Sequence, residues 1–176
     1  MICNCLELPF RPEVADFCIC IAVIHHLSTR ERRLRAIREI ARVLRRAGEA
    51  LIYVWAKNQK QNEKSSSYIK QGKTPDSDNI ENFKHFVRLA SCPENEVSLP
   101  IHVNRTQFKH EDLLVPWKLN KHIGEESELE EKQTFLRYYH VFEEGELEDL
   151  CRCVNGIEII ERYYDQGNWC VKFRKQ

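Results

Sequence analysis

The sequence feature that most constrains the fold is a strand, a helix and a second strand in succession over residues 16–56. Residues 17–24 form a nearly unbroken apolar run rich in β-branched residues, which favours a strand covered on both faces. Ser28 and Glu31 have the spacing of a capping box, which predicts the start of a helix. Residues 51–54 predict the second strand. These segments form a right-handed βαβ unit, whose ligands lie beyond the carboxyl ends of the strands.

The predicted helix is apolar on one side and basic on the other. Gly48 is placed to end it. The apolar positions recur at helical spacing, at Leu34, Ile37, Ile40, Ala41 and Leu44. Eight arginines fall between residues 30 and 46, and a solvated face explains them more simply than contacts with nucleic-acid phosphates do.

Composition favours one domain without a global electrostatic field, because Lys plus Arg and Asp plus Glu number 27 each in 176 residues. No apolar stretch reaches the roughly 18 residues that a membrane span needs, so we expect no membrane association and a location in the cytoplasm or nucleus. The eight cysteines include three Cys-x-Cys pairs. Structural zinc sites use wider spacings, so we expect free thiols and no metal site.

The rest of the chain predicts a polar insertion and an ordered C-terminal part. Residues 57–99 are rich in Lys, Gln, Asn and Ser, and we expect a mobile insertion in which residues 64–67 bury nothing. A helix is predicted through Leu147, Leu150, Cys151 and Val154, closed by Gly156. Residues 157–164 and 169–173 then predict a terminal hairpin.

This combination resembles the C-terminal half of a class I methyltransferase, an α/β Rossmann-like fold with a mostly parallel sheet and a terminal antiparallel hairpin. Ordered motifs go further and resemble the tRNA wobble-uridine (carboxymethyluridine) methyltransferases, which include the methyltransferase domain of the AlkB-homologue eight protein. These motifs lie at 21–33, 51–56, 102–106, 112–117, 137–142 with 144–147, and 165–171.

The sequence departs from the family at its beginning. The family starts with a strand, a glycine-rich loop and a second strand carrying an acidic residue, and none of these is found here. Asn4 replaces an acidic residue, and Arg-Ala-Gly at 46–48 replaces Pro-Gly-Gly. We therefore expect residues 1–176 to be a single, partial methyltransferase domain. Without neighbouring strands, residues 17–24 would form an exposed apolar edge.

The resemblance implies methyl transfer from S-adenosylmethionine to the carboxylate of wobble carboxymethyluridine, which gives the methyl ester. It implies two partners, the tRNA anticodon loop and a small zinc-binding activator subunit. The carboxylate is already anionic at pH 7, so positioning should matter more than a strong base. The alternative is a non-catalytic, methyltransferase-like protein that binds tRNA or protein.

Candidate site residues follow from the resemblance and from their place after the first strand. His25 and His26 are the catalytic candidates, although one of them could be a satisfied histidine at the helix entry. The candidates for the cofactor are Asn4, Cys5 and Ala22. Those for the substrate are Arg105, Arg137, Tyr138, Tyr139, His140, Asn168 and Trp169. The arginines could equally be surface ion pairs, and the tyrosines could simply face the core.

Overall fold

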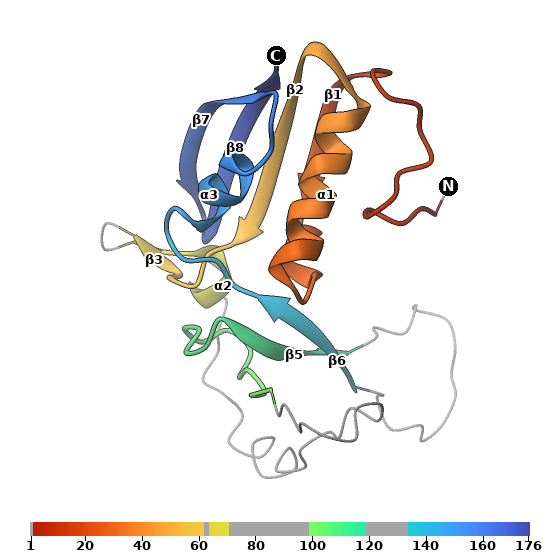
Figure 1. Ribbon diagram of the computed structural model, residues 1–176. Coiled ribbons are helices and arrows are strands. Elements are labelled where there is room, and N and C mark those ends of the chain that lie inside the picture. Colours follow the sequence, from red (N-terminus) through yellow and green to blue (C-terminus); the bar gives the residue numbers. More distant parts are fainter. Residues whose placement is uncertain (1, 62–63, 71–98, 119–133) are drawn as a thin grey trace, which may run out of the picture.

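The computed structural model describes residues 2–61, 64–70, 99–118 and 134–176. Its main sheet has the strand order β1-β2-β8-β7, and β5 pairs with β6 in a separate sheet (Figure 1). The elements in chain order are β1 (Ala15–Ile21), η1 (Ile24–His26), α1 (Arg30–Val43), β2 (Leu44–Trp55), β3 (Lys60–Gln61), β4 (Lys64–Ser65), α2 (Ser67–Lys70), β5 (Asp112–Lys118), β6 (Thr134–His140), α3 (Glu146–Arg152), β7 (Ile157–Asp165) and β8 (Asn168–Lys175).

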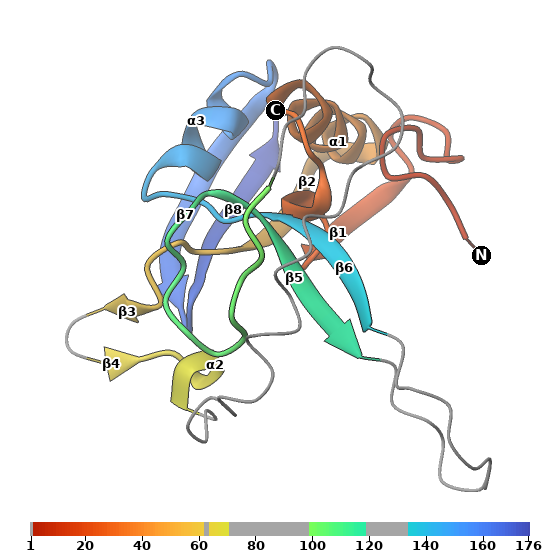
Figure 2. The ribbon, with the colours of Figure 1, turned by 90° about the horizontal axis from the view of Figure 1, so that it is seen from below.

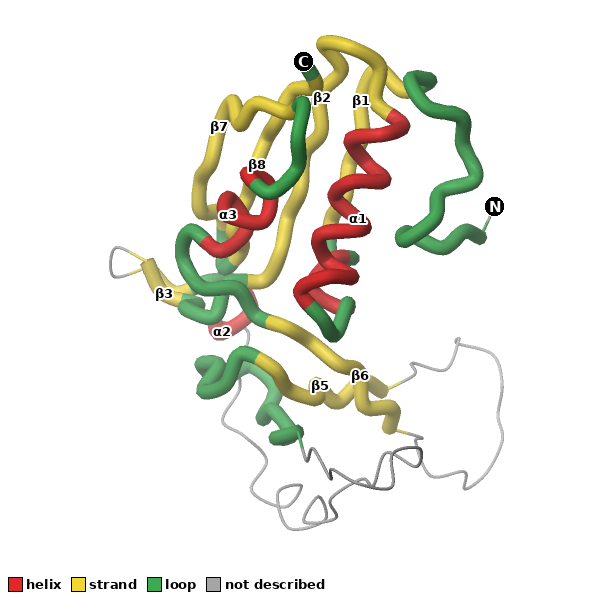
Figure 3. The backbone as a smooth tube through the Cα atoms, viewed as in Figure 1, coloured by secondary structure: helices red, strands yellow, loops and turns green. Residues whose placement is uncertain are grey.

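The predicted βαβ unit and terminal hairpin are confirmed. β1 and β2 are parallel, β8 runs antiparallel to β2, and β7 closes the hairpin with β8. Among the named strands of the described residues, β1 and β2 are therefore the pair that runs parallel. α1 and α3 lie on one face of this sheet (Figure 3). The five apolar residues predicted on α1 and the four predicted on α3 are all buried.

The expectation that the first strand is covered on both faces is wrong. Phe17, Ile19 and Ile21 are 49%, 64% and 54% exposed. β1 lies at the edge of the sheet with β2 as its neighbour. Its alternate residues Cys18 and Cys20 pack against the main core, while the other three side chains stay about half exposed. The described residues of β1 therefore form the exposed apolar edge that the resemblance to the family predicts.

Two details of the predicted helix are also corrected. The N-cap is Thr29 rather than Ser28, and its hydroxyl accepts a hydrogen bond from the Arg32 N–H at 3.2 Å. The helix ends at Val43, and Gly48 lies within β2 instead. A side chain there would stand 2.9 Å from the Arg45 carbonyl oxygen and 3.1 Å from two carbonyl oxygens of the β1 segment. Gly48 therefore permits the close approach of β1 and β2.

The beginning of the polar insertion packs against the end of the terminal hairpin. Gln59 and Ser66 are both buried, so the expectation that residues 64–67 bury nothing is wrong at Ser66. The Gln59 side-chain amide donates to the carbonyl oxygens of Ala56 and Gly167. The Ser66 hydroxyl donates to the side-chain oxygen of Gln59. The part of the insertion at 71–98 lies outside the described residues. No described helix has the length and apolar character of a membrane span.

Candidate active site

The antiparallel pair β5 and β6 lies across the carboxyl ends of β1 and β2 (Figure 2). The Phe142 N–H donates to the Trp55 carbonyl at 2.8 Å, and the Lys57 N–H donates to the Phe142 carbonyl at the same distance. These bonds fix the end of β6 beside the end of β2. The short helix η1, which carries both candidate histidines, lies between them because Ile24 anchors it in the core.

His25 is 1% exposed and stacks on Tyr139, with ring centroids 4.9 Å apart. Its Nδ1 accepts the Trp55 backbone N–H at 3.3 Å, so the neutral ring carries its proton on Nε2. That buried Nε2 has no partner among the described residues. Burial, followed by the charges of His26, Arg137 and His140, lowers the pKa of His25 to about 3. His25 is therefore a buried, neutral residue beneath Tyr139, where it supports that ring. The catalytic role predicted for it stays a prediction.

His26 is half-buried and lies nearer the surface than His25. Its Nδ1 donates to the Tyr138 carbonyl oxygen at 3.0 Å, and its ring meets Tyr139 edge-on at 4.3 Å. In the neutral ring this bond makes Nε2 an acceptor. Of the two candidate histidines, His26 is the one placed to meet a ligand.

Five rings continue outward from these histidines, and we call them the aromatic cluster. They come from β2, β6, α2 and the loop before β5, and are Tyr139, Trp55, Tyr68, Phe108 and His102. Tyr139 and Trp55 stack at 4.7 Å, and Phe108 and His102 stack at 4.3 Å. The cluster packs against Leu113 and Val115 of β5 and against Val141, which follows β6. It therefore joins the histidine site to the β5 side of the molecule.

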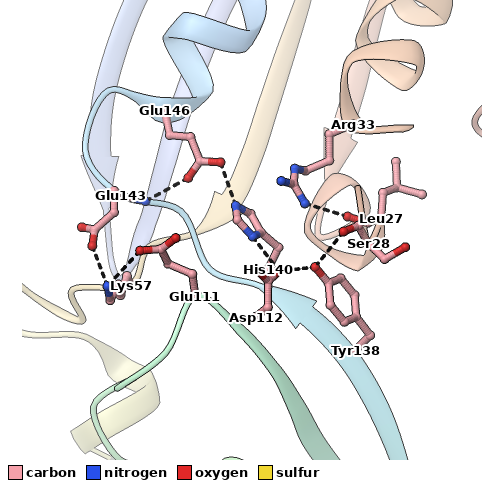
Figure 4. Close-up of polar contacts among 10 residues, drawn as sticks. All are labelled: Leu27, Ser28, Arg33, Lys57, Glu111, Asp112, Tyr138, His140, Glu143 and Glu146. Atoms are coloured by element: carbon pink, nitrogen blue, oxygen red, sulfur yellow. Dashed lines mark hydrogen bonds and ion pairs between the residues drawn. The ribbon is translucent and has the colours of Figure 1, made fainter. Parts of the chain in front are cut away.

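A polar network holds β6 on its other side (Figure 4). His140 donates from Nδ1 to Asp112 at 2.9 Å and from Nε2 to Glu146 at 2.7 Å. Two donating nitrogens require the protonated ring. Burial opposes that charge, but the hydrogen bonds to Glu146 and Asp112 outweigh it and raise the pKa of His140. The same network lowers the pKa of Asp112, because the bonds from Tyr138 and His140 outweigh its burial.

The predicted substrate residues of β6 occupy different positions around this network. The Tyr138 hydroxyl donates to Asp112 and lies 3.2 Å from the Ser28 carbonyl oxygen, and Tyr139 and His140 are buried. Arg137 is exposed, with its guanidinium carbon 5.3 Å from the centroid of Trp117 and 5.7 Å from that of Tyr139. Arg137 is therefore an exposed cation beside Tyr139, the ring that His26 also contacts.

The other predicted substrate residues are not all brought to this place. Arg105 lies beside Tyr68 at the outer end of the aromatic cluster. Asn168 is the register partner of Trp55 and donates to the Asp165 carbonyl in the hairpin turn. Trp169 packs against the main core on the face that the helices cover. Its predicted role in stacking on a substrate base stays a prediction.

The predicted cofactor residues lie near the end of β1. Ala22 is exposed, has a φ of 58° and donates to the Tyr53 carbonyl at 3.3 Å. Cys5 packs against the main core and is close enough to Cys20 of β1 to raise the pKa of that thiol, after burial. The Asn4 side chain accepts the Leu6 N–H at 3.0 Å. The structure does not contradict these positions.

Sequence reasoning missed four residues that build the site. Trp55 fixes the tautomer of His25, and Asp112 and Glu146 hold His140. Arg33 is buried on α1 and donates to the Leu27 carbonyl at 2.9 Å behind η1. Asp112 and Glu146 each belong to a family-like motif, which was the available signal. Their pairing with one histidine depends on how β5, β6 and α3 pack together in three dimensions.

Comparisons with known proteins agree with this architecture. A family model described as a methyltransferase domain matches residues 1–52. The chain is 41% identical over 213 residues to the tRNA (carboxymethyluridine(34)-5-O)-methyltransferase ALKBH8 of Macaca fascicularis, covering 99% of this chain and 32% of that protein. It is 43% identical over 187 residues to the protein of the same name in Xenopus tropicalis, covering 99% and 28%. The chain thus spans about a third of the length of these curated relatives.

A solved structure supports the fold independently. An S-adenosylmethionine-dependent methyltransferase from Clostridium acetobutylicum superimposes with a TM-score of 0.57 at 6% identity, covering 99% of this chain and 63% of that one. At this identity the likeness concerns the fold alone. From the extended sequence match, the chain belongs to the family of the tRNA (carboxymethyluridine(34)-5-O)-methyltransferases, of which it spans a part.

Proposed function

We propose that this chain takes part in methyl transfer from S-adenosylmethionine to the carboxylate of wobble carboxymethyluridine in tRNA. The names of its relatives give the reaction class. The observation that carries the proposal for this chain is that the exposed Arg137 guanidinium lies over Tyr139, the same ring that His26 meets edge-on. A fork of N–H donors next to a ring and an imidazole suits a ligand that joins a carboxylate to a flat base.

Arg137 would hold the substrate carboxylate. Its guanidinium lies over the rings of Trp117 and Tyr139, and no hydrogen bond to another described residue takes its N–H donors, so a bidentate pair with a carboxylate is open to it. His26 would meet the base or ribose through Nε2, because its Nδ1 is already committed to the Tyr138 carbonyl. His25 stays neutral and supports Tyr139 from beneath. The carboxylate needs no base, since it is ionised at neutral pH.

The residues near β1 fit one wall of a cofactor site. Ala22, just beyond β1, is exposed and has a left-handed backbone conformation. Asn4 and Cys5 lie on the N-terminal segment that packs beside β1. S-adenosylmethionine, when bound, supplies the methyl group, and the carboxylate oxygen forms the new ester bond as the sulfur retains the pair of the broken C–S bond. What this chain contributes is alignment, which can lower a barrier by about 7 kcal/mol in favourable cases.

The proposed partners are a tRNA anticodon loop and a small zinc-binding activator subunit. The first follows from the substrate in the relatives' names, and the second from the family that the motifs resemble. Exposed apolar residues on β1 are consistent with a chain that works beside other protein surface.

The proposal is tested with the full chain, the activator subunit and an anticodon stem-loop that carries carboxymethyluridine at the wobble position. Methyl-ester formation is followed by mass spectrometry of the digested nucleosides, and cofactor binding by calorimetry. Ester that depends on the chain supports the proposal. Cofactor binding without ester, or neither, would leave the non-catalytic alternative standing.

A further inference from the structure

A hollow lies beside the loop that precedes β5, at the end of the aromatic cluster that holds His102. Its volume is about 430 Å³, within the range of ligand pockets. Its apolar walls are Pro100, Ile101, Val103 and Leu113, and its polar walls are His102, Thr106, Gln107, Lys109 and His110. None of these residues was given a role in the reaction proposed above, although His102 belongs to the aromatic cluster and Leu113 packs against it.

The two kinds of wall are suited to one kind of ligand. Lys109 and His110 are exposed, and neither has an interaction with another described residue. Gln107, by contrast, is committed at both ends to the backbone of residues 57 and 59, and Thr106 donates to the Val103 carbonyl. The available donors are therefore cationic or imidazole groups at one side of an apolar hollow. A flat apolar group joined to a phosphate matches this arrangement.

A series of packed rings links the wall of this hollow to the proposed reaction site. Its wall residue His102 stacks on Phe108, which contacts Trp55, which stacks on Tyr139. His102 is held in place by the Tyr68 hydroxyl at 3.0 Å, and burial lowers its pKa to about 4, so it presents a neutral ring. Leu113, another wall residue, packs in the same small core as Tyr139.

We propose that this hollow binds a second nucleotide of the same anticodon loop, with its base against the apolar wall and its phosphate at Lys109 and His110. The inference rests on the proposed function for the identity of the RNA, and it adds a subsite that holds the strand while the wobble nucleotide reaches Arg137. A single-stranded loop has unstacked bases available for such a contact.

The experiment measures binding of an unmodified anticodon stem-loop to the full chain by fluorescence anisotropy over a range of salt. Lys109→Ala should weaken binding about fivefold and make the dependence on salt shallower by roughly 0.7, the value for one contact to a single strand. Lys109→Arg should bind like the wild type, because it keeps the charge. Arg152→Ala removes one exposed charge on α3 and serves as the matched control, with no expected change.

A second measurement separates this inference from the proposed function. Methylation of the free carboxymethyluridine nucleoside tests the reaction site without any flanking nucleotide, and Lys109→Ala should leave its rate unchanged. With the stem-loop, the same variant should raise KM and leave kcat in place. Equal affinity of wild type and Lys109→Ala, or a loss equal to that of Arg152→Ala, overturns the second subsite. If binding of the stem-loop depends on Lys109 but the free nucleoside is not methylated, the result supports the subsite and counts against the proposed reaction.

Discussion

The Nε2–H of His140 donates a 2.7 Å hydrogen bond to the carboxylate of Glu146, which joins the last residue of β6 to the first residue of α3. Its other nitrogen binds Asp112 on β5. One buried imidazolium therefore fixes three elements that meet beside the candidate active site, and both Tyr138 and Tyr139 depend on where it holds β6.

Replacing His140 should destabilise the protein in a manner that depends on pH. Folding raises the pKa of His140 above its ordinary value of 6.5, so its stabilisation is complete below 6.5 and is lost as the pH rises through the higher folded value. His140→Gln should cost about 2 kcal/mol at about pH 6 and less at about pH 9, measured by urea unfolding. His110→Gln on the surface is the control. A cost that grows with pH would contradict the charged state.

His25 should have the opposite dependence on pH. Its folded pKa is lowered from 6.5 to about 3, so the stability it contributes is present above 6.5 and is lost as the pH falls towards 3. Over that interval the wild type should lose about 1.4 kcal/mol per pH unit more than His25→Gln, which cannot titrate. Tyr139→Phe keeps the histidine and should keep the wild-type slope. Parallel curves for wild type and His25→Gln would show that His25 is not buried as a neutral ring.

The ion pair between Glu148 and Arg162 should show an asymmetry between its two partners. Glu148 is 3% exposed and accepts from Arg162 at 3.0 Å, while its second oxygen has no partner among the described residues. Arg162→Ala leaves that carboxylate buried and unpaired and should cost about 3 kcal/mol of unfolding free energy. Adding Glu148→Gln should recover part of the loss. If the double variant is no more stable than Arg162→Ala, the buried charge is not the cause.

The catalytic efficiency, kcat/KM, should depend on the shape of the cation at position 137 as well as on its charge. Lysine cannot form a bidentate pair or stack on Trp117 and Tyr139 in the same way, so Arg137→Lys should lower kcat/KM for the stem-loop by about tenfold or more. Arg152→Lys on α3 is the matched control and should keep the wild-type rate. Methyl-ester kinetics give the measurement, and an unchanged kcat/KM in Arg137→Lys would remove Arg137 from the site.

The sequence by itself determined the βαβ unit, the inward side of α1, the helix α3 and the terminal hairpin. Each depends on contacts near in sequence, because periodicity and turn residues report which side of an element is apolar. The same local signals misplaced the N-cap by one residue. They also overstated the burial of β1, because an apolar run does not reveal which strands or helices lie beside it.

Only the tertiary structure decided which partner each candidate residue contacts and how deeply each one is buried. Tyr138, Tyr139 and His140 are adjacent in sequence, yet one binds Asp112, one stacks on His25 and one is held between two carboxylates. His25 and His26 differ as sharply, since one is buried and the other half-exposed. The contacts behind these differences range from 6 positions apart, between His140 and Glu146, to 112 positions apart, between His26 and Tyr138. Tertiary pairings of this kind leave no periodic trace in a single sequence.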